Sequence, residues 1–371
     1  MRVAVDARYA YLPVRAGFGE AHRALLAELL PLSDGIEWDL YLCGREVMAD
    51  IPDGPRIHRH VLEFPFGSLW THLRLPAGLY AHPPDVTLYM AQSIPIVAPG
   101  VKIVTIHDLT FRKVKLRSFA DRMRLEAQTR HAARFADRIV AVSETTRRDL
   151  GAEYGVPESK IVVAREAYDS HRFKADHDPA RVAALGSRLG LTGPYVLFVG
   201  TTAPHKNLVR LVEAFDRLLF AGDLPHQLVI AGRPGSAEAA LRSAMLGLSD
   251  PGRAIRLVAV AHEDIPLLFA GAAAFVFPSL YEGFGLPILE AMASGVPVVA
   301  SDAGAIPEVA GPAAMLVDPL DVEGLAKALD RVLRERGLAD RLIRLGLARA
   351  AEFSWAHTAR VFRALLDEYR R

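Results

Sequence analysis

Two series of short apolar runs, separated by segments of helical periodicity, constrain the fold of this 371-residue chain most strongly. The first series contains RVAVDA, WDLYLC, VTLYM, KIVTIHD and RIVAVS. The second contains YVLFVG, HQLVIAG, AIRLVA, AAAFVFPS, VPVVAS and AAMLVD. Nearly continuous apolar strands that alternate with helices are typical of parallel sheets covered on both faces. Because the series occurs twice and the chain is too long for one ordinary core, the sequence predicts an α/β protein with two doubly wound, Rossmann-like domains.

The domain boundaries are predicted from changes in composition. Residues 1–166 form the first predicted domain and residues 193–353 the second. Residues 167–192, which carry Asp, His, Pro and Gly and only a short helical pattern, are the predicted linker. The last segment, FSWAHTARVFRALLDEYRR, has the period of an amphipathic helix over 354–371, with Ser354 as its N-cap.

Composition excludes several functional classes. The 44 Lys and Arg residues against 43 Asp and Glu give a net charge of +1, without the basic excess of a nucleic-acid-binding protein. The one cysteine, Cys43, permits no internal disulfide and no cysteine-based metal site. Arg2, Asp6 and Arg8 make the amino terminus unlike a signal peptide, so we expect a cytoplasmic protein. The histidines show no metal-ligand spacing, and we expect no metal.

One stretch, SLYEGFGLPILEAMASGVPVVAS at 279–301, carries the strongest functional signal. It follows a buried strand, and open α/β sheets bind ligands at the carboxyl edge of their strands. Gly283 and Gly285 allow backbone N–H groups to approach a ligand closely. Pro287 suits the first turn of a helix, predicted over 287–294 and ending at Gly295. The start of this helix would favour an anion.

Glu282 and Glu290 flank this bend. Eight residues of helix would separate them by about 12 Å, but Glu282 precedes the helix, so the bend can bring both carboxylates to one ligand at two depths. Two carboxylates suit the hydroxyls of two rings, such as a sugar and a ribose joined by a diphosphate. The alternative is an ordinary strand-to-helix turn with solvated glutamates. The bend, the helix start and the following strand together favour the ligand site.

Two further turns have an arrangement suited to anions. In GTTAPHKNLVRLVEAF, residues 200–215, Lys206 lies near a helix start, where a cation opposes the helix dipole unless an anionic ligand is present. Lys206 is therefore the candidate diphosphate ligand, with His205 as a weaker helper. In VRAGFGEAHRALLAEL, residues 14–29, Gly17 and Gly19 precede a helix. The alternatives are a surface lysine and a plain turn.

The segment TIHDLTF, residues 105–111, ends another strand and places His107 and Asp108 at the carboxyl edge of the first sheet. A histidine there can donate to a ligand oxygen or position an acceptor. On the residues alone, a structural histidine is slightly favoured.

A basic segment lies between residues 112 and 148, with eleven Lys or Arg against four Asp or Glu. The basic residues are Arg112, Lys113, Lys115, Arg117, Arg122, Arg124, Arg130, Arg134, Arg138, Arg147 and Arg148. A helix here could contact anionic lipid or a phosphorylated acceptor. A solvated helix face is the favoured interpretation.

Together these segments resemble the retaining glycosyltransferases of family four, which have the GT-B fold, and the resemblance covers almost the whole chain. The most specific block is YEGFGLPILEAMASGVPVVASDAGAIPEV, which is similar to the family's E-x7-E region. VGTTAPHKNLVRLVEAF is similar to its phosphate-binding region, HDLTF and AGFGE to loops of its first domain, and FSWAHTARVF to a final helix that crosses back to the first domain.

The resemblance implies roles for residues of the second domain. Glu282 would bind hydroxyls of the donor sugar, and Glu290 would hold the nucleotide ribose. The backbone amides of Phe284, Gly285 and Leu286 would contact sugar and phosphate.

Further roles follow from the same resemblance. Lys206 would hold the diphosphate, and Gly17 would approach it from the first domain. His107 would lie near the donor sugar and the acceptor. Gly232 and Arg233, in VIAGRPG, would pass near the base and phosphates.

The chain departs from the family pattern at two places. His205 stands where the family usually has arginine, and a histidine is mostly neutral at pH 7. REAYD, residues 165–169, stands at the domain junction in place of Pro-Asn-Gly-Val-Asp.

The resemblance implies transfer of a hexosyl unit, mannosyl favoured, from a nucleoside diphosphate sugar with retention of configuration and without a metal. GDP-mannose is the preferred donor, and UDP-sugars remain open. The acceptor is a glycan, a lipid-linked sugar or a small molecule, with peripheral contact at the inner membrane as an option. Two alternatives are another GT-B enzyme, such as an epimerase or a phosphorylase, and a non-catalytic sugar-nucleotide-binding protein. A periplasmic binding protein is disfavoured by the missing signal peptide.

Overall fold

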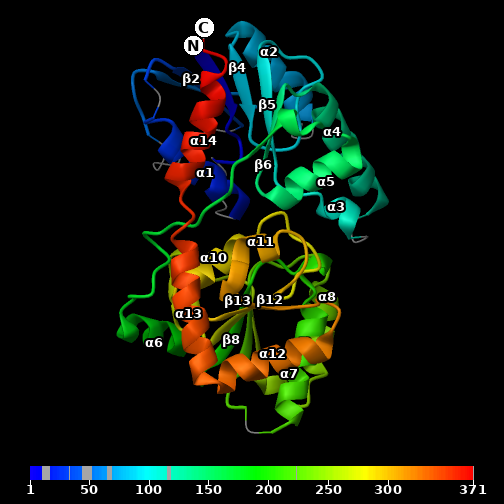
Figure 1. The fold of residues 1–371 in the computed structure, drawn as a ribbon, viewed down its shortest axis with the longest axis vertical. Helices are drawn as coiled ribbons and strands as arrows, with labels where there is room; N and C mark the ends of the chain where they lie inside the picture. Colours follow the sequence, from blue (N-terminus) through cyan, green and yellow to red (C-terminus); the bar gives the residue numbers. More distant parts are fainter. Residues whose placement is uncertain are drawn as a thin grey trace. The chain divides into compact units, whose positions relative to one another are not determined.

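Two compact units make up the chain in a computed structural model that describes residues 1–10, 17–32, 34–43, 52–64, 69–114, 118–222 and 224–370, with the backbone alone at 17 and 18. Unit 1 comprises Met1–Ala167 and Ser354–Arg371, and unit 2 comprises Tyr168–Phe353. Each unit has a parallel sheet with helices on both faces (Figure 1). The predicted fold class is confirmed.

The sheet of unit 1 has seven parallel strands in the order β3-β2-β1-β4-β5-β6-β7. The strands are β1 (Arg2–Asp6), β2 (Glu37–Leu42), β3 (Ile57–Val61), β4 (Val86–Tyr89), β5 (Val101–Ile106), β6 (Arg138–Ala141) and β7 (Ile161–Val163). Alternate residues of a strand point to opposite faces. Accordingly, Val3 and Val5 enter one hydrophobic cluster and Ala4 enters another.

Different helices cover the two faces of this sheet. The helices of unit 1 are α1 (Gly17–Leu29), the π-helical turn η2 (Trp70–Arg74), α2 (Leu75–Ala81), α3 (Thr110–Lys113), α4 (Phe119–Phe135), α5 (Glu144–Tyr154), η3 (Glu158–Lys160) and α14 (Trp355–Asp367). Leu26 of α1 and Phe362 of α14 share the cluster with Val3 and Val5. Trp70, Ala132 of α4 and Leu150 of α5 share the cluster on the other face.

The sheet of unit 2 has six parallel strands in the order β10-β9-β8-β11-β12-β13. The strands are β8 (Tyr195–Val199), β9 (Gln227–Ala231), β10 (Ala254–Leu257), β11 (Ala274–Phe277), β12 (Val298–Ser301) and β13 (Ala314–Val317). One continuous cluster of buried apolar side chains fills this unit.

The helices of unit 2 are α6 (Pro179–Arg188), η4 (Pro204–Lys206), α7 (Leu208–Phe220), α8 (Glu238–Leu246), η5 (Pro251–Arg253), η6 (His262–Asp264), α9 (Ile265–Ala270), α10 (Leu286–Ala293), α11 (Ile306–Ala310), η7 (Gly311–Ala313), α12 (Val322–Arg334) and α13 (Arg336–Ala350). α7 packs against α8 and α12, and α10 packs against α9 and α13. None of the helices among the described residues has the length and apolar character that a membrane span requires.

The chain passes from unit 1 to unit 2 after Ala167 and returns to unit 1 at Ser354. Residues 167–192, predicted as a linker, contain α6, and Phe173 and Leu185 are buried in the core of unit 2. α14 begins as the sequence predicts, because the Ser354 side chain accepts a hydrogen bond from the backbone N–H of His357. The final helix then packs on α1, within unit 1.

Candidate functional site

Three loops of unit 2 meet at the carboxyl edge of its sheet. They follow β8, β9 and β11, and β8 pairs directly with both of the other strands. Parallel neighbours end at the same edge, so residues 200–206, 232–237 and 278–285 lie beside one another. These loops carry most of the residues that the sequence predicts for a donor site.

Lys206 and Glu282 form a buried ion pair at this edge. Lys206 Nζ lies 2.6 Å from Glu282 Oε1, and the two side chains are only 13% and 15% exposed. The Lys206 ammonium also lies 4.9 Å from the centre of the Phe277 ring. Their loops are joined by the backbone N–H of Leu280, which donates to the His205 carbonyl over 2.7 Å. The predicted proximity of lysine and the first glutamate is therefore present.

The lysine is held by the turn that carries it. Lys206 ends the 3₁₀ turn η4, and Asn207 then adopts the left-handed conformation with φ of 60°. The buried Asn207 amide donates to the carbonyls of Pro278 and Pro319. These bonds fix the backbone that carries Lys206.

The electrostatics of the pair favour a charged Glu282. Burial alone would raise the pKa of this carboxyl group, but the positive charges of Lys206 and His205 outweigh that effect and hold the pKa below its ordinary value. His205 thus contributes to the electrostatics of Glu282, in addition to its predicted role as a weaker phosphate ligand.

Helix α10 begins one residue earlier than predicted. Gly285 is its N-cap with φ of 113°, a conformation that glycine adopts without strain, and Ser294 follows its last residue. Gly283 and Phe284, in the preceding loop, are buried. Glu290 lies in the second turn of α10 and is half-buried. The first backbone N–H groups of α10, including that of Leu286, are oriented as an anion site requires.

The loop after β9 approaches the loop after β8 so closely that a side chain does not fit. A Cβ atom on Gly232 would lie 2.1 Å from the Gly200 carbonyl oxygen. Arg233, the next residue, is exposed. The Gly232 position therefore requires glycine for close backbone approach.

A polar network that the sequence analysis missed fixes these two loops. Arg256, 5% exposed, donates to the Gly232 carbonyl over 2.7 Å and to Glu238 Oε2 over 3.0 Å. Glu238 accepts from Thr202 Oγ1 over 2.8 Å, and that oxygen accepts from the backbone N–H of Gly235 over 2.6 Å. The arginine inside the otherwise apolar run AIRLVA was a signal for such a network, since an arginine packed among apolar residues needs partners for its charge.

The carboxyl edge of the unit 1 sheet holds a different cluster. His107 follows β5, and its Nδ1 lies 2.9 Å from Glu166 Oε1. Its Nε2 lies 3.1 Å from the Met90 carbonyl oxygen and 3.3 Å from His22 Nε2. His107 was predicted at this edge, but His22 and Glu166 were not.

The two histidines have opposite pKa shifts. Burial lowers the pKa of His107, but the hydrogen bond and charge of Glu166 outweigh burial and raise it. Burial holds the pKa of His22 well below its usual value, and charged His107 adds to that effect. The pair therefore carries its positive charge on His107.

Two other predicted residues of unit 1 have positions that can be described. Asp108 Oδ1 accepts from the backbone N–H of Thr110 over 2.8 Å, which supports the start of α3. Gly17 is the first residue of α1. The residues just before Gly17 in the predicted glycine loop, Val14–Ala16, lie outside the described residues.

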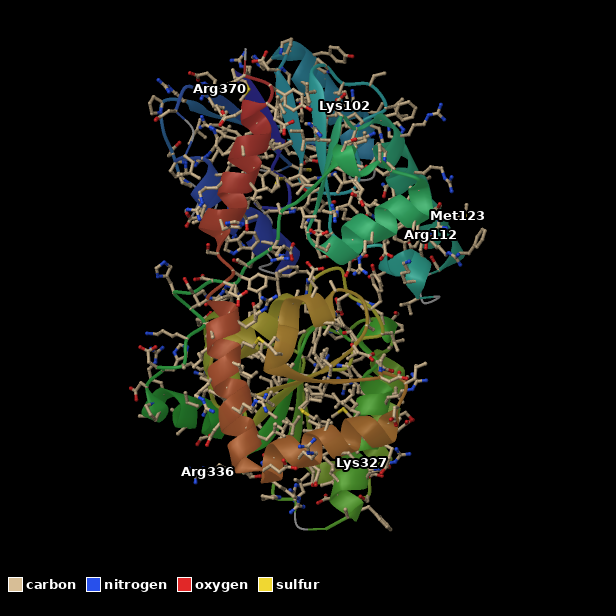
Figure 2. All side chains as sticks on the ribbon, viewed as in Figure 1. Lys102, Arg112, Met123, Lys327, Arg336 and Arg370 are labelled. Carbon is tan, nitrogen blue, oxygen red and sulfur yellow. The ribbon has the colours of Figure 1, made fainter. Side chains whose placement is uncertain are left out.

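The basic segment is less charged at its surface than its composition suggests. Arg112 pairs with Glu126 over 2.8 Å and Lys113 with Asp149 over 2.8 Å. Lys115 and Arg117 lie outside the described residues. On α4, Phe119 is 80% exposed, and Met123 lies at the outer surface of this helix (Figure 2).

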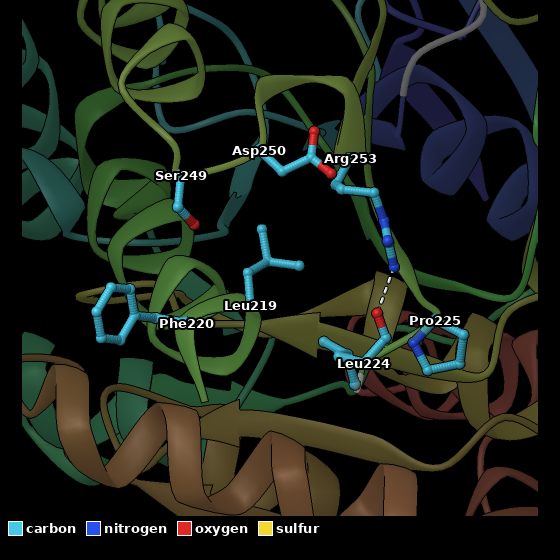
Figure 3. Close-up of a pocket in the computed structure, with 7 residues that line it drawn as sticks. All are labelled: Leu219, Phe220, Leu224, Pro225, Ser249, Asp250 and Arg253. Atoms are coloured by element: carbon cyan, nitrogen blue, oxygen red, sulfur yellow. Dashed lines mark hydrogen bonds between the residues drawn. The ribbon is translucent and has the colours of Figure 1, made fainter. Parts of the chain in front are cut away.

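A separate surface hollow lies at the opposite edge of the unit 2 sheet. It is lined by Leu219, Phe220, Leu224, Pro225, Ser249, Asp250 and Arg253, which end α7 or precede β9 and β10 (Figure 3). In this hollow Arg253 donates to the Leu224 carbonyl. The predicted donor residues are at the carboxyl edge, so this hollow is not the predicted site.

No metal-binding cluster is found among the residues that the structure describes, where a cluster means three or more His, Cys, Asp or Glu side chains. The Lys206 ammonium supplies positive charge at the carboxyl edge of unit 2.

Comparison with known proteins decides the family. The model "Glycosyl transferases group 1" matches residues 187–348, and "Glycosyltransferase Family 4" matches residues 33–172. The 2-deoxystreptamine glucosyltransferase of Streptomyces kanamyceticus is 30% identical over 271 residues, which cover 70% of this chain and 69% of the relative. The chain belongs to the group 1 glycosyltransferase family. The resemblance stated from the motifs is confirmed.

Two further proteins are similar to this group 1 glycosyltransferase, one in sequence and one in fold. The O-antigen chain mannosyltransferase B of Escherichia coli is 32% identical over 255 residues, or 68% of this chain. The match spans 66% of that relative, just under two thirds of its length. The crystal structure of Anabaena HepE in complex with UDP-glucose has a TM-score of 0.76 at 21% identity and covers 99% of this chain and 100% of HepE. That similarity shows the GT-B fold.

Proposed function

We propose that the protein transfers a hexosyl unit, mannosyl favoured, from a nucleoside diphosphate sugar to an acceptor with retention of anomeric configuration. The observation that supports this most is the buried Lys206–Glu282 pair, with 2.6 Å between Nζ and Oε1, at the carboxyl edge of the unit 2 sheet. In this proposal the Lys206 ammonium binds the diphosphate, and the neighbouring carboxylate accepts hydrogen bonds from sugar hydroxyls.

The charges fit the proposed reaction. The leaving group is a diphosphate, so negative charge grows on it as the glycosidic bond breaks. Lys206 and the first N–H groups of α10 are preorganised to stabilise that charge. Glu282 stays ionised and binds donor hydroxyls, and Glu290 binds the ribose. The departing phosphate takes the acceptor's proton on the same face, which leads to retention. His107 holds a hydroxyl of the donor sugar or the acceptor.

Gly232 and Arg233 contact the base and phosphates of the donor in this proposal, and Gly283, Phe284, Gly285 and Leu286 contact sugar and phosphate through their backbone. Asp108 acts on the acceptor side by keeping the loop after His107 in place.

GDP-mannose is the first donor to test, with UDP-sugars next. Mannosyltransferases are among the relatives, whereas HepE was solved with UDP-glucose, so the donor panel varies the base as well as the sugar. We propose that transfer needs neither a cofactor nor a metal, with Lys206 neutralising the diphosphate. The O-antigen relative makes a glycan acceptor in polysaccharide biosynthesis the first class to test.

The test is transfer from a panel of GDP- and UDP-sugars to glycan, lipid-linked and small-molecule acceptors. Release of nucleoside diphosphate is measured together with the anomeric configuration of the product by NMR. The proposal expects an acceptor-dependent product with the donor's configuration, and strong loss in Lys206→Ala and Glu282→Gln. Lys327→Ala is the control, because this lysine is 72% exposed on α12.

Each alternative gives its own result. Conversion of the sugar nucleotide without an acceptor would indicate an epimerase, and saturable binding without any turnover would indicate a binding protein. An inverted product, or normal transfer by both site variants, would contradict the proposal.

For a lipid-linked acceptor, we propose peripheral contact between α4 and an anionic membrane. Phe119 and Met123 are 80% and 49% exposed, and the neighbouring Arg122 and Arg124 are exposed as well. Apolar side chains flanked by arginines suit an anionic bilayer surface. Sedimentation with vesicles tests this. We expect binding to anionic but not zwitterionic vesicles and loss of binding in Phe119→Ser with Met123→Ser; equal binding to both vesicle types would contradict it.

A further inference from the structure

The His107 cluster contains a carboxylate that neither the motifs nor the comparisons assign to any role. Glu166 Oε1 lies 2.9 Å from His107 Nδ1, and the two side chains are 11% and 19% exposed. The two residues are 59 positions apart in the sequence. Glu166 belongs to REAYD, the segment that departs from the family pattern at the domain junction.

Both ring nitrogens of His107 face oxygen acceptors. The Glu166 carboxylate lies opposite Nδ1, and the Met90 carbonyl lies 3.1 Å from Nε2. A carbonyl oxygen only accepts, and an ionised carboxylate only accepts. A ring that satisfies both partners must therefore donate from both nitrogens, which only the protonated imidazolium does.

The neighbouring histidine is compatible with this charge. His22 Nε2 lies 3.3 Å from His107 Nε2, and the ring centres are 5.4 Å apart. His22 is 2% exposed, and burial holds its pKa well below the usual value, whereas the pKa of His107 is raised. A neutral His22 adds no repulsion against a proton on His107.

The backbone around Glu166 is held on both sides. The backbone N–H of Ala164 donates to the Ala141 carbonyl at the end of β6 over 2.9 Å. The Arg165 carbonyl accepts from Thr358 Oγ1 in the first turn of α14. Ala164 and Ala167 are themselves buried. Glu166 therefore has a fixed base from which to orient the imidazole.

We propose that Glu166 is a positioning residue that holds His107 as an oriented imidazolium, so that the edge of unit 1 presents a positive hydrogen-bond donor to an oxygen of the donor sugar or the acceptor. This inference rests on the proposed glycosyl transfer. Glu166 itself does not contact the substrate. It acts through His107, in the way that a carboxylate orients an imidazole elsewhere in enzymes.

Other charged groups near the ring are too few to replace Glu166. Asp108, on the same strand end, adds a smaller favourable charge. Arg8 acts on His22 and opposes positive charge there, and its guanidinium lies 3.2 Å from Asp6. Loss of the Glu166 charge should therefore let burial lower the titration midpoint of His107.

The experiment is an NMR titration of the whole protein with ¹³Cε1-labelled histidine between pH 5 and 9, assigned with His107→Asn. We expect the midpoint of His107 above about 6.5, the value of a free imidazole. In Glu166→Gln it should fall by about one unit or more. Glu158→Gln is the matched control, since that carboxylate is 83% exposed in the same unit, and it should leave the midpoint unchanged.

Transfer assays separate positioning from a structural role. The high-pH limb of kcat should move to lower pH in Glu166→Gln, because the protonated ring is lost sooner. In a His107→Asn background, Glu166→Gln should cause no further loss, whereas a merely structural role would lower the rate again. Thermal unfolding shows whether each variant is folded.

A wild-type His107 midpoint at or below about 6.5, or an unchanged midpoint in folded Glu166→Gln, overturns the proposal. The first of these results needs only the His107→Asn variant that assigns the resonance. If no sugar nucleotide supports transfer, the proposed function fails, while the titration still decides whether Glu166 sets the charge of His107.

Discussion

The carboxyl edges of the two sheets are built from similar strands but differ in their chemistry. In unit 2 the edge holds the ion pair Lys206–Glu282, in which burial would raise the pKa of Glu282 but the charge of Lys206 helps to hold it below its ordinary value. In unit 1 it holds His107, whose pKa burial would lower but the hydrogen bond and charge of Glu166 raise above its ordinary value. A fixed charge suits binding of a diphosphate. A titratable donor suits an oxygen whose own proton moves during transfer.

The two edges also differ in how they are held together. Unit 2 uses close backbone contacts, such as Gly232 against Gly200, and the Arg256 network between neighbouring loops. Unit 1 uses side chains from α1, the β5 end and the segment after β7, together with the Met90 backbone carbonyl just after β4. The arrangement in unit 2 can be recognised in the sequence as a glycine-rich motif. The arrangement in unit 1 leaves no such motif.

The largest expected effect is the loss of the fixed charge. Lys206→Ala should reduce kcat/KM by about 10²- to 10³-fold, the usual result of removing one preorganised donor to a developing anion. The loss should be similar at pH 6 and pH 9, because the pKa of Glu282, the partner of Lys206, lies below its ordinary value and the carboxylate is ionised at both. A loss of kcat/KM at only one of these two pH values would contradict the proposed difference in charge between the two sheet edges.

The next largest effect is expected at Gly232, where the backbone of the loop after β9 lies close to the Gly200 carbonyl. Gly232→Ala forces a Cβ against the Gly200 carbonyl and a φ of 132° on alanine. We expect a loss of about 1–3 kcal/mol in the free energy of unfolding and weaker donor binding, measured by denaturant titration and calorimetry. Gly337→Ala, where a Cβ would meet nothing within 4 Å, is the control. Equal stability of both variants would contradict this packing.

The contribution of the ion pair to the free energy of unfolding should vary modestly with pH, and only in the acid range. The pKa of Glu282 lies below its ordinary value of 4.5, so the pair stabilises the fold above pH 4.5 and loses that contribution as the pH falls through the lowered value. Glu282→Gln should therefore lower the free energy of unfolding by a constant amount above pH 4.5 and remove the pH dependence that the pair adds on the acid side. An acid limb of the stability curve that is the same in this variant and in wild type would contradict the assignment.

The smallest expected effect concerns α14. Ser354→Ala removes the N-cap and should cost about 1 kcal/mol of unfolding free energy, by denaturant titration. Donor affinity should stay unchanged, because α14 packs in unit 1. Weaker donor binding in this variant would show that the edge of unit 2 depends on α14.

Most of the fold was predictable because burial on both faces leaves long apolar runs. β3 and β7 were missed for a physical reason, since they are the outermost strands of their sheet. β3 reads IHRHV, with no residue fully buried, and β7 has three residues. Edge strands pack on one side only, so their sequences need not be apolar.

The candidate site was predictable where chemistry and backbone geometry share a short segment. Glu282, Gly285 and the start of α10 are such a case, and Lys206 could be inferred from its unfavourable place near a helix start. His22 and Glu166 could not, because 85 and 59 residues separate them from His107 and only the strand order brings them together.

Calorimetric titration of GDP-mannose and UDP-sugars into wild type, Lys206→Ala and Lys327→Ala tests the central claim most directly. The account predicts saturable binding of at least one sugar nucleotide to wild type and Lys327→Ala, and affinity about tenfold weaker or more in Lys206→Ala, as expected for loss of a charge-assisted hydrogen bond. Equal affinity in all three proteins, or no binding of any sugar nucleotide to wild type, would contradict it.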